Sequence, residues 1–171
     1  MQRFGFGVIA LCLTASAAFA DRAHLLFQSE NWVVEGVTSD DHSYSCRARI
    51  SVPGDSFSIR QMPDQIIRLE FKSDEWDFGE GETASLEVAV DTLSPWSFTE
   101  ATLLQSSVFV DLYDLDQGKT FVRQIAKGKL LSLRTITGTQ VRSYSLTGSS
   151  DAITKLEECD KLPVPDRNPF N

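Results

Sequence analysis

The sequence predicts an all-β protein, mainly an antiparallel β-sandwich or a partly open barrel, with one or two short helices, one of them near the C-terminus. Two observations support this fold class. Apolar and polar residues alternate with period two over eight short segments, as expected for strands with one buried face. Turn-forming residues separate these segments at short intervals, which is typical of antiparallel sandwiches and barrels.

The clearest strand covers residues 43–52, where Cys46 and Ile50 fall on one face and Arg47 and Arg49 on the other. A Pro-Gly-Asp turn follows and returns the chain as a second strand, so the two segments predict a hairpin. The return strand is predicted at residues 56–61, and the others at 31–37, 65–71, 83–90, 108–113, 130–137 and 140–146.

Two short helices are predicted among the strands. The first covers residues 119–127 and ends at Gly128, a residue suited to the left-handed C-cap. The second follows Gly148, and one of the two serines after this glycine is expected to cap the free amide groups. Its buried face, at the spacing i, i+4 and i+7, consists of Ala152, Leu156 and Cys159.

Residues 1–20 have the organisation of a secretory signal peptide. Arg3 supplies the positive charge, an apolar stretch follows, and Ala18 and Ala20 occupy the −3 and −1 positions that signal peptidase requires. The apolar stretch is shorter than the roughly 20 residues of a membrane span, so cleavage after Ala20 is expected. Lipidation at Cys12 and an uncleaved anchor are the alternative interpretations.

The predicted mature chain consists of a single β-rich domain, residues 21–161, and a Pro-rich tail, residues 162–171. Loss of Arg3 with the leader changes the net charge from −8 to about −9. This acidity argues against a nucleic-acid partner, because binding a polyphosphate requires a basic surface. No apolar run of the mature chain is long enough to span a membrane. We therefore expect a periplasmic or secreted protein.

Two cysteines remain after removal of the leader, Cys46 and Cys159, and both lie on faces that are predicted to point inward. An exported protein with two buried thiols most simply joins them in a disulfide. A redox pair and two free buried thiols are the alternatives, although a redox pair usually combines close spacing with an exposed thiol of low pKa. The sequence predicts one long-range disulfide between the start and the end of the fold.

No catalytic or metal-binding signature stands out. The mature chain retains two histidines, His24 and His42, and lacks the Gly-x-Ser-x-Gly motif of many serine hydrolases. Residues 111–118 have some likeness to a calcium loop, but leucines interrupt the alternate ligand positions and no closing glutamate follows. We expect no enzyme activity, no cofactor and no metal, with a hydrolase of unusual site as an alternative.

Two aromatic–polar–aromatic triplets flank the strand predicted at residues 83–90, and they form the candidate binding patch. Trp76 and Phe78 belong to the first triplet, and Trp96 and Phe98 belong to the second. Aromatic rings in surface loops often recognise partners, so four neighbouring rings would form such a patch. The alternative is that the rings cap two ends of the core, because an eight-residue strand separates its ends by more than about 20 Å.

Features near both ends of the chain point to a family resemblance. Trp32 precedes the strand of Cys46, and the segment 144–152 precedes Leu156 and Cys159. In these features, its size and its signal peptide, the chain resembles the small exported proteobacterial proteins of the invasion-associated locus B type. Those proteins typically carry a cysteine just after the core of the early tryptophan strand, where this chain has none. The resemblance implies a periplasmic, non-enzymatic role and carries over no site residue.

These observations predict a non-enzymatic binding or interaction protein of the periplasm or cell envelope, with a protein or peptide as its partner. A carrier of a small ligand inside a β-barrel is the alternative function. Such a carrier needs an interior lined by small or polar residues, whereas Tyr44, Ile50, Leu69 and Leu86 are bulky residues on inward faces. A filled core therefore favours the interaction protein.

Overall fold

The computed structural model describes residues 22–39, 43–62, 65–159 and 161, which form ten strands and two helices. The predicted signal peptide and Pro-rich tail lie outside the described residues. The elements in chain order are β1 (Arg22–Ser29), β2 (Trp32–Thr38), β3 (Tyr44–Val52), β4 (Asp55–Gln61), β5 (Ile67–Ser73), β6 (Phe78–Val90), β7 (Trp96–Gln105), β8 (Ser107–Leu112), α1 (Leu115–Lys127), β9 (Leu130–Thr135), β10 (Gln140–Ser145) and α2 (Ser149–Cys159).

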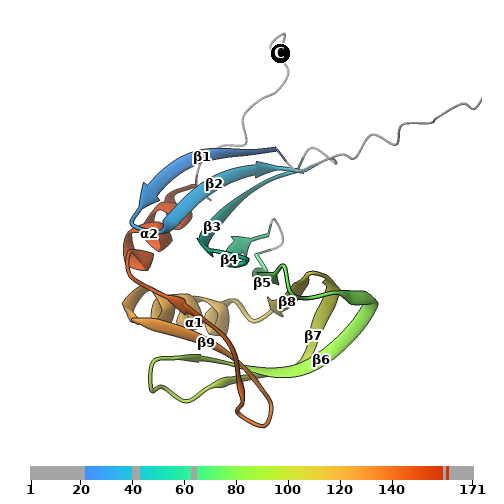
Figure 1. Cartoon of the computed structure of the whole chain (residues 1–171). Coiled ribbons are helices and arrows are strands. Elements are labelled where there is room, and N and C mark those ends of the chain that lie inside the picture. Colours follow the sequence, from blue (N-terminus) through green and yellow to red (C-terminus); the bar gives the residue numbers. More distant parts are fainter. Residues whose placement is uncertain (1–21, 40–42, 63–64, 160, 162–171) are drawn as a thin grey trace, which may run out of the picture.

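All strands of the described chain belong to one antiparallel sheet in the order β1-β2-β3-β4-β5-β8-β7-β6-β9-β10. Figure 1 shows that this sheet curves strongly around the two helices. The predicted fold class, all-β and antiparallel with two helices, is confirmed. Of the two predicted arrangements, the partly open barrel describes the structure better than the sandwich. A single sheet curves around the core, and its edge strands β1 and β10 do not pair with each other.

The strands β1 and β7 escape prediction from the sequence. β1 is an edge strand whose side chains are mostly exposed, so no alternation of buried and exposed residues marks it. β7 begins with the second aromatic triplet and alternates only at its start, because most of its side chains also face solvent. Backbone pairing holds β1 to β2 and β7 to β6. The sequence pattern predicts a strand for each of these two neighbours.

Helix α1 begins at Leu115, earlier than the predicted residue 119. The Asp114 carboxylate accepts hydrogen bonds from the backbone amides of Asp116 and Gln117, both at 2.9 Å, and thereby caps the helix. The segment with some likeness to a calcium loop thus consists of the end of β8 and the cap and first turn of α1. The predicted left-handed cap is wrong, because Gly128 has φ −80° and ψ 174°.

Glycine is nevertheless required at the end of α1 because space is short there. A Cβ atom at Gly128 would collide with the side chains of Val90 and Leu146. Helix α2 follows Gly148, as the sequence predicts, and the structure shows that this glycine has φ +86°. The hydroxyl of Ser149 donates to the backbone carbonyl of Ile125 at 2.8 Å, so this serine joins the start of α2 to the last turn of α1.

The core joins the two halves of the curved sheet through aromatic side chains. Phe57 of β4 packs edge-on against Trp32 of β2, with ring centroids 6.2 Å apart, and in a tilted arrangement against Tyr144 of β10, with centroids 5.8 Å apart. All three rings are buried. The guanidinium of Arg142, also in β10, donates to the carboxylate of Asp55 in β4 at 3.0 Å. Side chains, rather than a backbone ladder, therefore hold β10 over β4.

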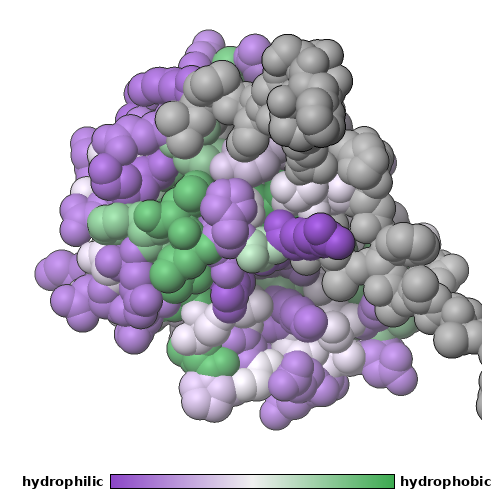
Figure 2. All heavy atoms as spheres, turned by 90° about the horizontal axis from the view of Figure 1, so that it is seen from above, coloured by the Kyte–Doolittle hydropathy of each residue, from purple (hydrophilic) through white to green (hydrophobic). Residues whose placement is uncertain are grey.

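The interior of the sheet is filled, as the sequence predicts. Ile50, Leu69 and Leu86 are buried and Tyr44 is partly buried against the core. None of the helices in the described chain is long and apolar enough to cross a membrane. Seen from above the view of Figure 1, hydrophobic side chains gather in one area with hydrophilic residues around it (Figure 2).

Candidate functional site

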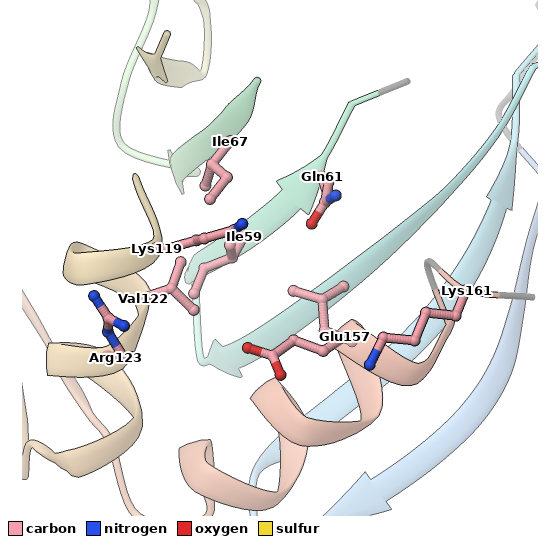
Figure 3. Close-up of a pocket in the computed structure, with 9 residues that line it drawn as sticks. Ile59, Gln61, Ile67, Lys119, Val122, Arg123, Glu157 and Lys161 are labelled. Atoms are coloured by element: carbon pink, nitrogen blue, oxygen red, sulfur yellow. The ribbon is translucent and has the colours of Figure 1, made fainter. Parts of the chain in front are cut away.

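A cavity of about 400 Å³ lies between α1, α2 and the strands β4 and β5. Figure 3 shows its lining side chains converging from both helices and both strands. Its inner wall is apolar, whereas most of its rim is charged, and such a combination suits an amphipathic ligand. The wall consists of Ile59, Ile67, Val122 and Leu156, and the rim of Gln61, Lys119, Arg123, Glu157 and Lys161.

Helix α1 supplies one side of this cavity. Lys119 and Arg123 are four residues apart, so they project from the same side of the helix. Phe121, fully buried in the core, orients the helix so that both cations stay exposed. A Cβ atom at Gly118 would press on the side chain of Ile67, so glycine allows α1 to approach β5 closely at the cavity.

The disulfide positions the other side of the cavity. Cys46 of β3 and Cys159 of α2 are bonded, with Cα atoms 6.1 Å apart, which confirms the predicted pairing. Both cysteines are buried. Leu156 and Glu157 precede Cys159 on the same helix, and Lys161 follows it. The bond therefore ties the part of α2 that lines the cavity to the central sheet.

The rim carries three cations and one carboxylate although the chain as a whole has a net charge of −8. Lys119 and Lys161 have no ion-pair partner among the residues that the structure describes. Arg123 donates to the hydroxyl of Thr120 at 3.0 Å. The cavity thus offers a positive rim to an anionic group and an apolar wall to an adjoining hydrocarbon group.

Sequence reasoning does not find this cavity. The spacing of Lys119 and Arg123 on a predicted helix is a usable signal, because it places two cations on one side. Glu157 and Lys161 come from a distant element, and only the packing of α2 beside α1 brings them to the same rim. No pattern in the sequence predicts that packing.

The first aromatic triplet lies at the start of β6. The rings of Trp76 and Phe78 have centroids 5.6 Å apart, and the guanidinium of Arg142 lies 5.4 Å from the Trp76 ring. Arg142 also forms an ion pair with Glu75. The two rings therefore lie beside a pair of charged side chains near the end of β5. Both rings are partly buried against the core.

The second triplet lies at the opposite end of the β6–β7 hairpin. The register places Phe78 opposite Gln105 but Trp96 opposite Val88, so the four candidate rings form two separate pairs of positions. Trp96 packs edge-on against Phe121 with centroids 5.4 Å apart, and Phe98 is also partly buried. Recognition of a partner by either triplet stays a prediction.

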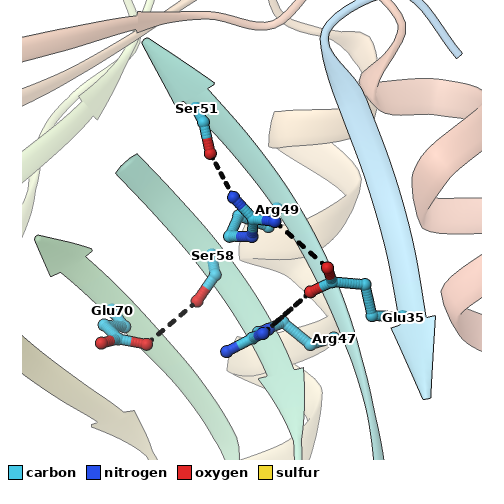
Figure 4. A network of polar contacts seen from close by, with 6 residues as sticks. All are labelled: Glu35, Arg47, Arg49, Ser51, Ser58 and Glu70. Carbon is cyan, nitrogen blue, oxygen red and sulfur yellow. Dashed lines mark hydrogen bonds and ion pairs between the residues drawn. The ribbon is translucent and has the colours of Figure 1, made fainter. Parts of the chain in front are cut away.

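A network of ion pairs covers the outer face of β2 and β3 (Figure 4). The carboxylate of Glu35 accepts hydrogen bonds from Arg47 at 2.8 and 3.1 Å and from Arg49 at 3.1 Å. Burial would raise the pKa of Glu35, but the hydrogen bonds and positive charges of the two arginines outweigh it and lower this pKa. The two arginines therefore stabilise the charged form of Glu35, and both of their positive charges lie beside this one carboxylate.

This network predicts a loss of stability in acid. Because the folded-state pKa of Glu35 lies below its unfolded value, its contribution is complete above pH 4.5 and is lost as the pH falls through the lowered folded-state pKa. We expect the Glu35→Gln variant to be less stable than the wild type at pH 7 and to approach it at pH 3. Urea denaturation at both pH values measures this, and an unchanged difference between the two would contradict it.

The prediction that the protein has no enzyme activity and no metal site concerns a small number of side chains, chiefly the two histidines. His24 is exposed in β1, where its ring stacks on that of Tyr44 with centroids 6.0 Å apart. His42 lies outside the described residues. Within the described chain, no three His, Cys, Asp or Glu side chains are grouped so that they could hold a metal ion. The absence of enzyme activity stays a prediction.

Comparison with known proteins gives a match among solved structures. No protein-family model matches the sequence, and no curated protein matches it. Among solved structures the chain is similar to invasion associated protein B from Bartonella henselae, with 15% sequence identity and a TM-score of 0.53. The similarity covers 83% of this chain and 97% of that protein. At this identity it shows that the two proteins share a fold, in agreement with the resemblance found in the sequence.

Proposed function

We propose that this chain is an exported, non-enzymatic binding protein of the cell envelope, of the invasion-associated locus B type, which captures a protein partner in the cavity between α1 and α2. The observation that carries the proposal is a positively charged rim around an apolar wall in an acidic protein. The bound segment of the partner has an apolar side chain beside an acidic one. The apolar group packs between Val122 and Leu156, and the carboxylate meets Lys119 and Arg123.

Three further observations support export and binding rather than catalysis. The sequence of residues 1–20 predicts a signal peptide, and the disulfide is typical of an oxidising compartment. The shared fold with an invasion associated protein is compatible with an exported protein. The interior of the sheet is filled, and the cavity beside the helices offers a place for a ligand group.

Reversal of charge on the rim tests the proposal. The mature protein is used to capture partners from periplasmic extract, and the affinity of the captured partner is then measured with Lys119→Glu and Arg123→Glu variants. We expect each reversal to weaken binding about ten-fold at low salt, because it turns an attraction to the partner's carboxylate into a repulsion. Higher salt should reduce the wild-type affinity.

Lys129→Glu is the matched control, because it makes the same charge change in an exposed residue outside the cavity. This variant should bind as the wild type does. All three variants alter exposed side chains, so their melting temperatures should stay close to that of the wild type. Equal affinities for the two rim variants and the control would refute the cavity as the binding site.

A further inference from the structure

The strands β7 and β8 are joined by a tight turn but pair over only part of their lengths. Their ladder contains the pairs Leu104–Ser107, Leu103–Val108 and Thr102–Phe109, and it stops there. Beyond this point β7 continues back to Trp96 in register with β6, and β8 continues to Leu112 in register with β5. The sheet is therefore split between β7 and β8, while β7 stays paired with β6 and β8 stays paired with β5.

The split forms a cleft of about 260 Å³. One wall is the segment Ser97–Ala101 of β7, and the other wall is Val110 and Asp111 of β8 with Tyr113 just after the strand. An irregularity in β7 accompanies the split, because the pairing with β6 shifts between Ala84 and Leu86. The cleft therefore lies where the ladder between β7 and β8 ends.

The backbone of both walls can pair with a further strand. In antiparallel sheets every second residue directs its N–H and C=O groups to the same neighbour. Ser97 and Phe98 pair with β6 and Val110–Leu112 pair with β5, and neither wall has a ladder partner across the cleft, although the Thr99 carbonyl accepts a hydrogen bond from the Ser85 hydroxyl at 3.4 Å. Two facing strand edges suit an extended chain, which can pair on both sides, and do not suit a helix, whose backbone groups are already bonded. We propose that an extended peptide segment of a basic partner protein adds as a strand between β7 and β8.

The side chains of the cleft define the chemistry of this segment. Phe98, Phe109 and Tyr113 offer aromatic surface, and Tyr113 is 75% exposed. Glu100 is exposed and has no ion-pair partner among the described residues. Asp111 is already held by Arg68 at 2.7 Å. Phe109 and Tyr113 alternate with the buried residues of β8 and so share the outer face with Glu100, whereas Phe98 packs against the core. An added strand with alternating basic and aliphatic residues would place its cations beside Glu100 and these two outer rings, and its aliphatic groups beside Phe98.

The experiment uses an acetylated and amidated heptapeptide of alternating lysine and valine with the full mature protein. Binding is measured by fluorescence anisotropy, and backbone amide exchange by NMR. We expect saturable binding with slower exchange of amides in Ser97–Ala101 and Val110–Tyr113. Glu100→Lys should weaken binding about five-fold, because it replaces one cross-strand charge pair by a repulsion. Glu82→Lys, the same change in an exposed residue of β6, should leave binding unchanged.

A second peptide separates strand addition from simple charge attraction. Replacing each valine by proline keeps the lysines but removes every second backbone N–H group, all on one side of the strand, so this peptide cannot pair with both walls and should fail to slow exchange on both sides of the cleft. Equal binding of the two peptides would overturn the proposal. Slow exchange at the cleft that depends on protein concentration without peptide would also overturn it, because a second copy would then be the occupant. Lys119→Glu should not change this binding, so the test is independent of the cavity between the helices.

Discussion

Replacing either disulfide cysteine, in Cys46→Ser or Cys159→Ser, is expected to lower the free energy of unfolding by about 4 kcal/mol. The bond closes a loop with a sequence separation of 113 residues, which restricts the unfolded chain strongly. Its loss also frees the end of α2 from β3 and leaves a hydroxyl in a buried position. Urea denaturation of the wild type and both variants measures the change.

The wild type with a reducing agent serves as the control for this effect. Reduction removes the same bond without changing the sequence, so its loss of stability should match that of the variants. Since Cys159 belongs to the helix that lines the cavity, the amides of α2 should also exchange faster in the variants. Variants as stable as the oxidised wild type would show that packing alone holds α2 in place.

Replacing Trp96 by alanine is expected to cost about 3 kcal/mol, the lower part of the range for large aromatic side chains, because this ring is only partly buried. The change removes the edge-on contact with Phe121 and the hydrogen bond from the indole Nε1 to Gln124, which is 2.8 Å long. Both partners lie on α1, so the ring anchors that helix to β7. Thermal and urea denaturation measure the loss.

Two variants separate the contributions to this effect. Trp96→Phe keeps an aromatic ring but loses the hydrogen bond, so it should cost about 1 kcal/mol. Trp76→Ala removes a ring that packs on Phe78 and Arg142 at the far end of the hairpin, and it should also cost about 1 kcal/mol. A stable Trp96→Ala protein that no longer captures a partner would instead identify this ring as a recognition residue.

The sequence predicts those elements whose burial alternates along one segment. The alternation around Cys46 and Ile50 predicts β3, and the spacing of Leu156 and Cys159 predicts the buried face of α2. These two local patterns together predict the disulfide, because each puts its cysteine on an inward face. The local signal fails at β1 and β7, since mostly exposed strands carry no alternation and depend on the backbone groups of a neighbour.

Tertiary structure alone decides where the candidate sites lie. Lys119 and Arg123 belong to one helix, but the cavity exists because α2, with Leu156, and Lys161 just after it pack beside that helix. The cleft between β7 and β8 likewise depends on each strand pairing better with its other neighbour. A sequence pattern records the burial of each residue, and thereby the class of fold. The order of strands depends instead on many weak long-range contacts, which leave no periodic trace in the chain.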